Sequence, residues 1–139
     1  MKPIVSETIR ACPQFYDLDP MQVVWHGNYA RFMEQARCAL MEKIGYSYGE
    51  MAESGYLWPI VDMRIKYVRP VTLSQEIEVT ATLTEYENAL KIAYRITDRA
   101  SGEVLTKAQT TQVAVFESTR EMSLESPPAL IDRVRKLLP

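Results

Sequence analysis

A single long amphipathic helix limits what this chain can fold into. Between residues 28 and 44, apolar side chains recur at steps of three and four residues, and they are Tyr29, Phe32, Met33, Ala36, Leu40 and Met41. Asn28 is a residue type that caps helix N-termini, and Gly45 is one that ends helices. One helix cannot enclose a core alone, so its apolar face requires a second layer of structure.

The second layer is predicted from residues that alternate between apolar and polar, the period of a half-buried strand. Four such segments follow Pro59, at 61–67, 76–84, 90–96 and 104–116. A weaker strand is predicted at 8–15, a short helical turn at 48–54 and a C-terminal helix at 129–138. The second and third segments form a hairpin and the fourth pairs with the third, so we expect a strand, the helix and then a four-strand meander.

This order of elements favours an α+β fold in which an antiparallel sheet wraps around one long central helix, the hotdog architecture. The 139 residues are enough for one such domain and leave no room for a second, so we expect a single hotdog domain over 1–139.

Composition excludes several classes of function. Sixteen basic and eighteen acidic residues give a formal charge of -2, which provides no broad positive field for nucleic acid. We find no signal-peptide pattern and no apolar stretch of membrane-spanning length, and therefore expect a cytoplasmic protein without a membrane partner. Cys12 and Cys38 are expected to be buried, and one histidine without metal-ligand spacing predicts neither a metal site nor a cofactor.

The segment just before the helix carries the most specific motif. It contains an Asp-x-Asp pair, Asp17 and Asp19, then a Val and aromatic run, then Asn28-Tyr29 opening the helix. In these features the chain resembles the hotdog-fold acyl-CoA thioesterases of the 4-hydroxybenzoyl-CoA thioesterase-like family. The resemblance continues along the helix and, more loosely, through the end of the 61–67 strand, so it covers most of the chain.

The resemblance implies a catalytic role for Asp19, the second aspartate of the pair. Asp19 would attack the thioester directly or activate water as a general base, and the residues leave both routes open. The backbone N-H groups of His26 and Gly27 would bind the oxyanion near the helix N-terminus, and the His26 side chain would help position the thioester or the water. Asp17 is expected to be structural, and Glu34 to be solvated or paired with Arg37.

The predicted substrate is a small or medium acyl thioester, hydrolysed to the free acid and the thiol. Trp25 and Tyr29 are candidates for contacting the substrate. Trp25 could equally pack in the core, and a tyrosine at the position of Tyr29 is more often buried against the sheet. Arg64, Lys66 and Arg69 are candidates for the phosphates of coenzyme A, against the alternative of a solvated polar face. Members of this family place their sites between protomers, which implies a homodimer or homotetramer.

Three other functions fit the same residues. The thioester carrier could be an acyl carrier protein in place of coenzyme A. A hydratase or dehydratase of the same architecture would use a His and an Asp on different elements, whereas the sole His26 lies near Asp19 in the sequence. A non-catalytic acyl-thioester binding or dimerisation module is the third, and it predicts that Asp19 has no effect on turnover.

Overall fold

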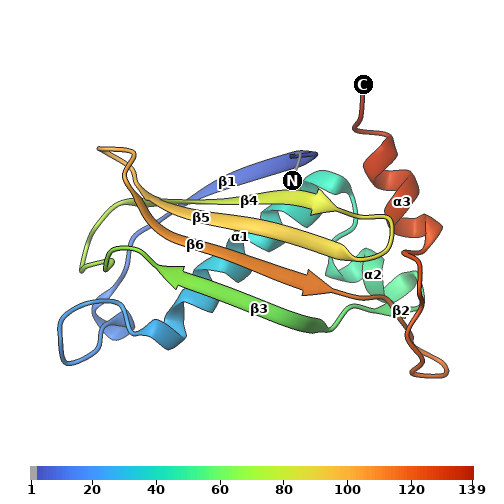
Figure 1. Ribbon diagram of the computed structural model, residues 1–139, viewed down its shortest axis with the longest axis horizontal. Coiled ribbons are helices and arrows are strands. Elements are labelled where there is room, and N and C mark those ends of the chain that lie inside the picture. The colour runs from blue at the N-terminus through green and yellow to red at the C-terminus, as the bar shows by residue number, and fades with distance from the viewer. Residues whose placement is uncertain (1–2) are drawn as a thin grey trace.

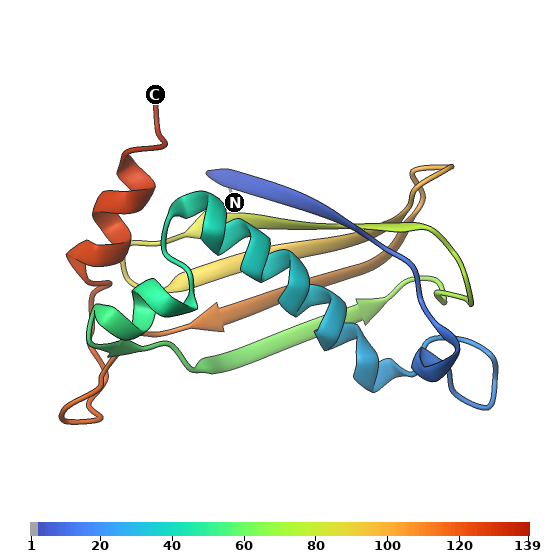
Figure 2. The ribbon, with the colours of Figure 1, turned by 180° about the vertical axis from the view of Figure 1, so that it is seen from behind.

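Five antiparallel strands form one twisted sheet, and the long helix lies across one of its faces (Figures 1 and 2). The computed structural model describes residues 3–139. The strands are β1 (Val5–Ala11), β3 (Ile60–Tyr67), β4 (Ile77–Glu85), β5 (Leu90–Asp98) and β6 (Val104–Gln112). The predicted combination of one long helix and an antiparallel sheet is confirmed.

The strand order differs from the predicted four-strand meander. Across the sheet the order is β1-β4-β5-β6-β3, so β3 pairs with β6 and not with β4. Only β4, β5 and β6 form a meander, and β1 takes the free side of β4. The physical reason is the connection after β3, which is too long for a tight hairpin and passes around one end of the sheet. Alternation determines which side chains share a face but not which strands are neighbours.

Helix α1 (Tyr29–Ile44) has the predicted position, and Gly45 ends it in the left-handed conformation with a φ of 86°. The predicted capping role of Asn28 is wrong, because its side chain makes no cap hydrogen bond. Its amide instead donates to the carbonyl oxygen of Asp17 at 2.9 Å. Asn28 therefore ties the preceding loop to the start of the helix.

The core lies between α1 and the sheet, where alternate residues of the strands meet the apolar face of the helix. Helix α1 packs most closely against β1 and β4. The fully buried members of this layer include Ala36, Leu40, Ile77, Val79, Ala81, Leu83, Leu90 and Ile92. Within residues 3–139, no helix packs along the length of β3, and this edge strand exposes its apolar side chains Val61, Met63 and Tyr67.

The smaller elements close the two ends of the sheet. They are the 3-10 turns η1 (Phe15–Asp17) and η2 (His26–Asn28), helix α2 (Tyr48–Glu53), the short strands β2 (Tyr56–Leu57) and β7 (Val115–Phe116), and helix α3 (Pro128–Arg135). The predicted turn at 48–54 is confirmed, whereas the strand predicted at 104–116 is divided between β6 and β7, and β7 pairs with β2. The first strand ends before Pro13, earlier than predicted, because proline has no N-H for the ladder.

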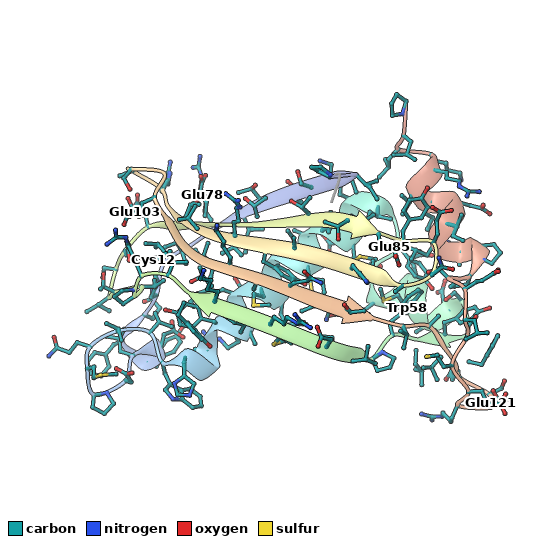
Figure 3. All side chains as sticks on the ribbon, in the orientation of Figure 1. Cys12, Trp58, Glu78, Glu85, Glu103 and Glu121 are labelled. Atoms are coloured by element: carbon teal, nitrogen blue, oxygen red, sulfur yellow. The ribbon has the colours of Figure 1, made fainter. Side chains whose placement is uncertain are left out.

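Two further expectations concern burial and the membrane. Cys12 is exposed, which contradicts its predicted burial, because it follows the last residue of β1 and lies outside the core (Figure 3). Cys38 is only half-buried, on the flank of α1. Within residues 3–139, no helix combines the length and the hydropathy that a transmembrane span needs.

Candidate active site

Asp17 organises the loop between β1 and α1. Its side chain is buried, with one carboxylate oxygen accepting the N-H of Gln14 at 2.8 Å and the other accepting Arg31 Nη2 at 2.7 Å. Its carbonyl oxygen accepts the N-H of Trp25 at 2.9 Å and the side-chain amide of Asn28. These contacts confirm the predicted structural role of Asp17, because both of its carboxylate oxygens are engaged within the loop.

Asp19 is held differently, in a tight turn that leaves part of its carboxylate free. The turn closes through two backbone hydrogen bonds of 2.9 Å, from Asp19 N-H to Val23 and from Gln22 N-H to Asp19. Gln22 adopts a φ of 65°, a left-handed conformation that the turn imposes. Asp19 Oδ1 accepts the N-H of Met21 at 2.8 Å, while Oδ2 accepts no hydrogen bond from the described part of the chain. One carboxylate oxygen is therefore available for chemistry.

The connection between β3 and β4 is hydrogen-bonded to this loop and clamps it in place, although the two segments are far apart in the sequence. The N-H of Val24 donates to the carbonyl of Val71 at 2.8 Å, and the N-H of Ser74 donates to the carbonyl of Pro13 at 3.2 Å. Both Val24 and Val71 are buried. Two loops that are distant in sequence thus form one wall at the end of the sheet.

Two backbone N-H groups at the start of the helical region have no acceptor. In η2, the N-H of Asn28 donates to the carbonyl of Trp25, but the N-H groups of His26 and Gly27 donate to no group within residues 3–139. They lie at the N-terminal end of α1, where the helix dipole is positive. Free N-H groups at this end of a helix are suited to stabilising a negative oxygen.

Gly27 lies close beneath the ring of Trp25. A Cβ atom at Gly27 would fall inside the van der Waals distance of three ring carbons of Trp25, so only glycine fits while the ring stays in place. Trp25 itself is 47% exposed and its ring is inclined against that of His26, with the centroids 5.2 Å apart. Trp25 therefore covers the Gly27 backbone and is not a core residue.

A cavity of about 250 Å³ brings several predicted residues together. Its wall includes Asp19, His26, Tyr29 and Arg69. Tyr29 is buried at 2% exposure, which raises the pKa of its hydroxyl, and that oxygen accepts the N-H of Val71 at 3.4 Å. Trp25, Arg64 and Lys66 do not line this cavity.

Tyr67 is a lining residue that the sequence analysis did not assign to the site. Its hydroxyl donates to the carbonyl of His26 at 3.0 Å, and its ring meets that of Tyr29 edge-on with centroids 4.8 Å apart. Tyr67 thereby links the end of β3 to the segment that carries the two free N-H groups. The only signal in the sequence was an aromatic residue at a strand end that belonged to the family pattern.

The three basic candidates lie in two places, Arg69 beyond the end of β3 at the cavity and the other two on β3 itself. Arg69 lies at the cavity and its Nε is 3.3 Å from Glu103, whose position at the β5–β6 turn is labelled in Figure 3. Arg64 and Lys66 alternate with the apolar residues of β3 and therefore stand on the face away from α1. The sequence could not show that Arg69 lies apart from Arg64 and Lys66, because the end of β3 at Tyr67 was not fixed by the alternation.

Glu34 and Arg37 lie on the flank of α1. Arg37 is buried, and its Nη2 donates to Glu34 Oε2 at 2.7 Å, as the sequence predicted. The same carboxylate oxygen accepts the hydroxyl of Tyr48 at 2.9 Å. Glu34 is therefore engaged with its neighbours, in contrast to Asp19. No group of three or more His, Cys, Asp and Glu side chains suitable for a metal ion occurs within residues 3–139.

Comparison with known proteins places this geometry in a family. Residues 13–134 match the thioesterase-like superfamily. The chain belongs to the thioesterase-like superfamily. It is 31% identical over 103 residues to the Bacillus subtilis protein YneP, whose name records a provisional assignment as an acyl-CoA thioesterase, with 73% of this chain and 74% of YneP covered.

Solved thioesterase structures have the same fold. A DHNA-CoA thioesterase from Staphylococcus aureus superposes with a TM-score of 0.84 at 24% identity, covering 95% of this chain and 90% of that one. The Synechocystis protein Slr0204, a 1,4-dihydroxy-2-naphthoyl-CoA thioesterase, also has a TM-score of 0.84, at 19% identity and with 96% and 98% covered. The predicted hotdog fold and the resemblance to acyl-CoA thioesterases are confirmed, and this member of the superfamily is a thioester hydrolase.

Proposed function

We propose that this thioesterase hydrolyses small or medium acyl-CoA thioesters in the cytoplasm, as one hotdog domain with Asp19 as its catalytic carboxylate. The observation that carries the proposal is the cavity at the start of α1. It combines a partly free Asp19 carboxylate with the neighbouring unpaired N-H groups of His26 and Gly27. The acyl-CoA activity in the name of YneP, at 31% identity, supports the same substrate class.

In the proposed reaction the thioester carbonyl carbon faces Asp19 Oδ2 and its oxygen faces the two N-H groups. Asp19 either attacks the carbon, giving a mixed anhydride that water then hydrolyses, or removes a proton from the attacking water. In both routes the carbonyl oxygen becomes negative and is stabilised by His26 N-H, Gly27 N-H and the helix dipole. The C–S bond breaks, the thiolate takes a proton, and free acid and thiol leave. The His26 side chain lies beside this position and would orient the thioester or the water.

The cavity also suggests how each part of the substrate is held. Tyr29 and Tyr67 form an aromatic wall that favours a compact acyl group. Arg69 is exposed at the cavity and would contact the phosphates of coenzyme A. Trp25 lies over Gly27 and would act on the oxyanion segment more than on the acyl group.

We propose a homodimer as the active unit, and a homotetramer built from two such dimers as the alternative assembly. Strand β3 is an edge of the sheet, and its outer hydrogen-bonding groups are free to pair with another strand. Apolar side chains of this strand that the helix leaves exposed, Val61, Met63 and Tyr67, would be buried by a second copy. Since Tyr67 lines the cavity, such a contact would also complete the wall of the site.

Thiol release from aliphatic and aromatic acyl-CoAs tests the proposal. We expect the Asp19→Asn variant to remain folded and to bind substrate, but to lose about two to four powers of ten in kcat, the usual contribution of a general acid–base group. Asp132→Asn, an exposed substitution on α3, is the matched control and should behave as the wild type. Equal turnover in the Asp19→Asn variant would remove Asp19 from the mechanism, whereas no thiol release by the wild type from any thioester would favour a binding module.

A further inference from the structure

Arg31 is a charged residue at the start of α1 that the proposed reaction does not use. It is the third residue of the helix, where a positive side chain is disfavoured by the positive end of the helix dipole. It does not line the cavity that holds Asp19. A cation in this position therefore stabilises neither the helix nor a bound substrate directly, and its contacts show what it does instead.

Two residues of the 3-10 turn η1 hold the Arg31 side chain. Its Nη2 donates to Asp17 Oδ1 at 2.7 Å. Its guanidinium carbon lies 5.6 Å from the centroid of the Tyr16 ring, within the range of a cation–π contact. Figure 2 shows η1 beside the first turn of α1. Arg31 therefore fastens the start of the helix to the turn that leads into the Asp19 loop.

The carboxylate of Asp17 depends on Arg31 for its charge balance. The Asp17 side chain is only 2% exposed, whereas that of Arg31 is 52% exposed. Within residues 3–139, no other Lys, Arg or His nitrogen lies within 4.0 Å of this carboxylate. A buried carboxylate that loses its partner cation is costly to keep ionised. Removing Arg31 would therefore force the Asp17 side chain either to take up a proton or to move toward water.

Asp17 also joins the two groups that act in the proposed reaction. Asp19 follows it by two residues in the chain. The carbonyl oxygen of Asp17 accepts the N-H of Trp25 and the side-chain amide of Asn28, each at 2.9 Å. These last two residues flank the free N-H groups at positions 26 and 27. A displacement of Asp17 would thus change the spacing between the Asp19 carboxylate and the two N-H groups.

We propose that Arg31 is a positioning residue of this thioesterase, whose ion pair with buried Asp17 sets the spacing between the Asp19 carboxylate and the two oxyanion N-H groups. The inference rests on the proposed function, because it takes both groups to act on one thioester carbonyl. Arg31 itself touches neither the substrate nor the reacting atoms. A misplacement of about 1 Å at the reacting centre can cost about a hundredfold in rate, so an ion pair outside the cavity can still control turnover.

The substitution Arg31→Gln tests this role, because it removes the charge and keeps a polar side chain. In thiol release from an acyl-CoA by the full-length protein, we expect kcat to fall at least about tenfold and KM to stay within about twofold. Arg31→Lys keeps the charge and should retain most of the activity. Arg10→Gln is the matched control, since it removes an arginine from an ion pair with Glu78 on β1, a strand that contributes no residue to the cavity.

The double variant Asp17→Asn/Arg31→Gln separates charge balance from the loss of the arginine side chain. An amide at position 17 can still accept the N-H of Gln14, and it needs no cation. The double variant should therefore recover kcat to within about threefold of wild type. Equal losses in the single and the double variant would overturn the proposal, and so would a rise in KM alone, which would place Arg31 in substrate binding.

A second comparison separates positioning from a general loss of stability. In the Asp19→Asn background, Arg31→Gln should lower kcat by less than about threefold, because the spacing that it sets no longer serves a catalytic carboxylate. Urea denaturation shows which variants are folded in the assay. Equal losses in both backgrounds, or an unchanged kcat in Arg31→Gln with any urea midpoint, would overturn the proposal and leave the role of Asp19 intact. If Asp19→Asn itself keeps wild-type turnover, the proposed function fails and this inference fails with it.

Discussion

The sharpest test of the proposed oxyanion site is the substitution Gly27→Ala. The added methyl group would overlap three carbon atoms of the Trp25 ring, so either the ring leaves or the backbone shifts. Trp25 is 47% exposed, so about half of its side-chain surface is buried. A fully buried aromatic side chain covers about 200 Å², so displacing the ring would expose about 100 Å² to water. At ~25 cal/mol/Å² this lowers the free energy of unfolding by ~2.5 kcal/mol. This is the upper limit of the expected loss of stability.

The larger effect should be on catalysis. If the backbone shifts, the His26 and Gly27 N-H groups no longer point at the thioester oxygen, and the loss of one such donor costs about two to three powers of ten in kcat. KM should change little, because the oxyanion exists only in the transition state. The assay is steady-state thiol release from an acyl-CoA, together with urea denaturation of the same protein. Gly49→Ala is the control, since the nearest atom to its added Cβ, Ser47 Oγ, is 4.0 Å away.

The double variant Trp25→Ala/Gly27→Ala identifies the cause. Removing the ring makes room for the methyl group, so the double variant should regain about tenfold or more in kcat over Gly27→Ala alone. Full activity in Gly27→Ala, or an equal loss in the double variant, would refute the argument that Trp25 packing holds the oxyanion segment.

Two further predictions concern tyrosines. Tyr67→Phe removes the hydrogen bond to the His26 carbonyl, and we expect kcat to fall by up to about tenfold at ~1.4 kcal/mol, with KM unchanged, in the same thiol-release assay; a rise in KM alone would place Tyr67 in substrate binding instead. Burial raises the pKa of Tyr94 from 10.0 to about 12, against a hydrogen bond with Thr110 that lowers it. Tyr94 ionises at a lower pH in the unfolded chain than in the folded protein, so ionisation favours unfolding. The free energy of unfolding is therefore unaffected by Tyr94 below about pH 10 and falls as the pH rises through 12, by up to ~2.7 kcal/mol. Urea unfolding from pH 8 to 12 should show this loss in wild type and a smaller one in Tyr94→Phe, and parallel curves would contradict it.

The sequence predicts which side chains of each helix and strand face the core, but it does not predict which strands pair with one another. The helix at 28–44 and its end at Gly45 were predicted because apolar spacing and a glycine act within a few residues. The pairing of β3 with β6 was not, because pairing depends on the path of the 68–76 connection around the end of the sheet. Likewise Asn28 is a residue type that caps helices, but its side-chain amide instead donates a hydrogen bond to the carbonyl oxygen of Asp17.

The same division applies to the candidate site. Asp19, His26, Tyr29 and Arg69, which are all site candidates from the sequence, line one cavity. Tyr67 was missed as a site residue because its contact with His26 joins two elements far apart in the chain. Trp25, Arg64 and Lys66 have suitable chemistry, but strand alternation and the packing over Gly27 direct them away from the cavity.

The clamp between the two loops has a consequence for folding. The Asp19 turn is fixed by contacts of Val24 with Val71 and of Pro13 with Ser74. These contacts join a segment that precedes α1 in the sequence to a segment that follows β3. Such contacts have a high contact order, and closing the long intervening loop costs entropy that only an assembled sheet repays. The catalytic turn should therefore become ordered late in refolding, so that recovery of activity lags behind recovery of helical signal. In the native state the same turn should open locally, and exchange its amide hydrogens, before the sheet does.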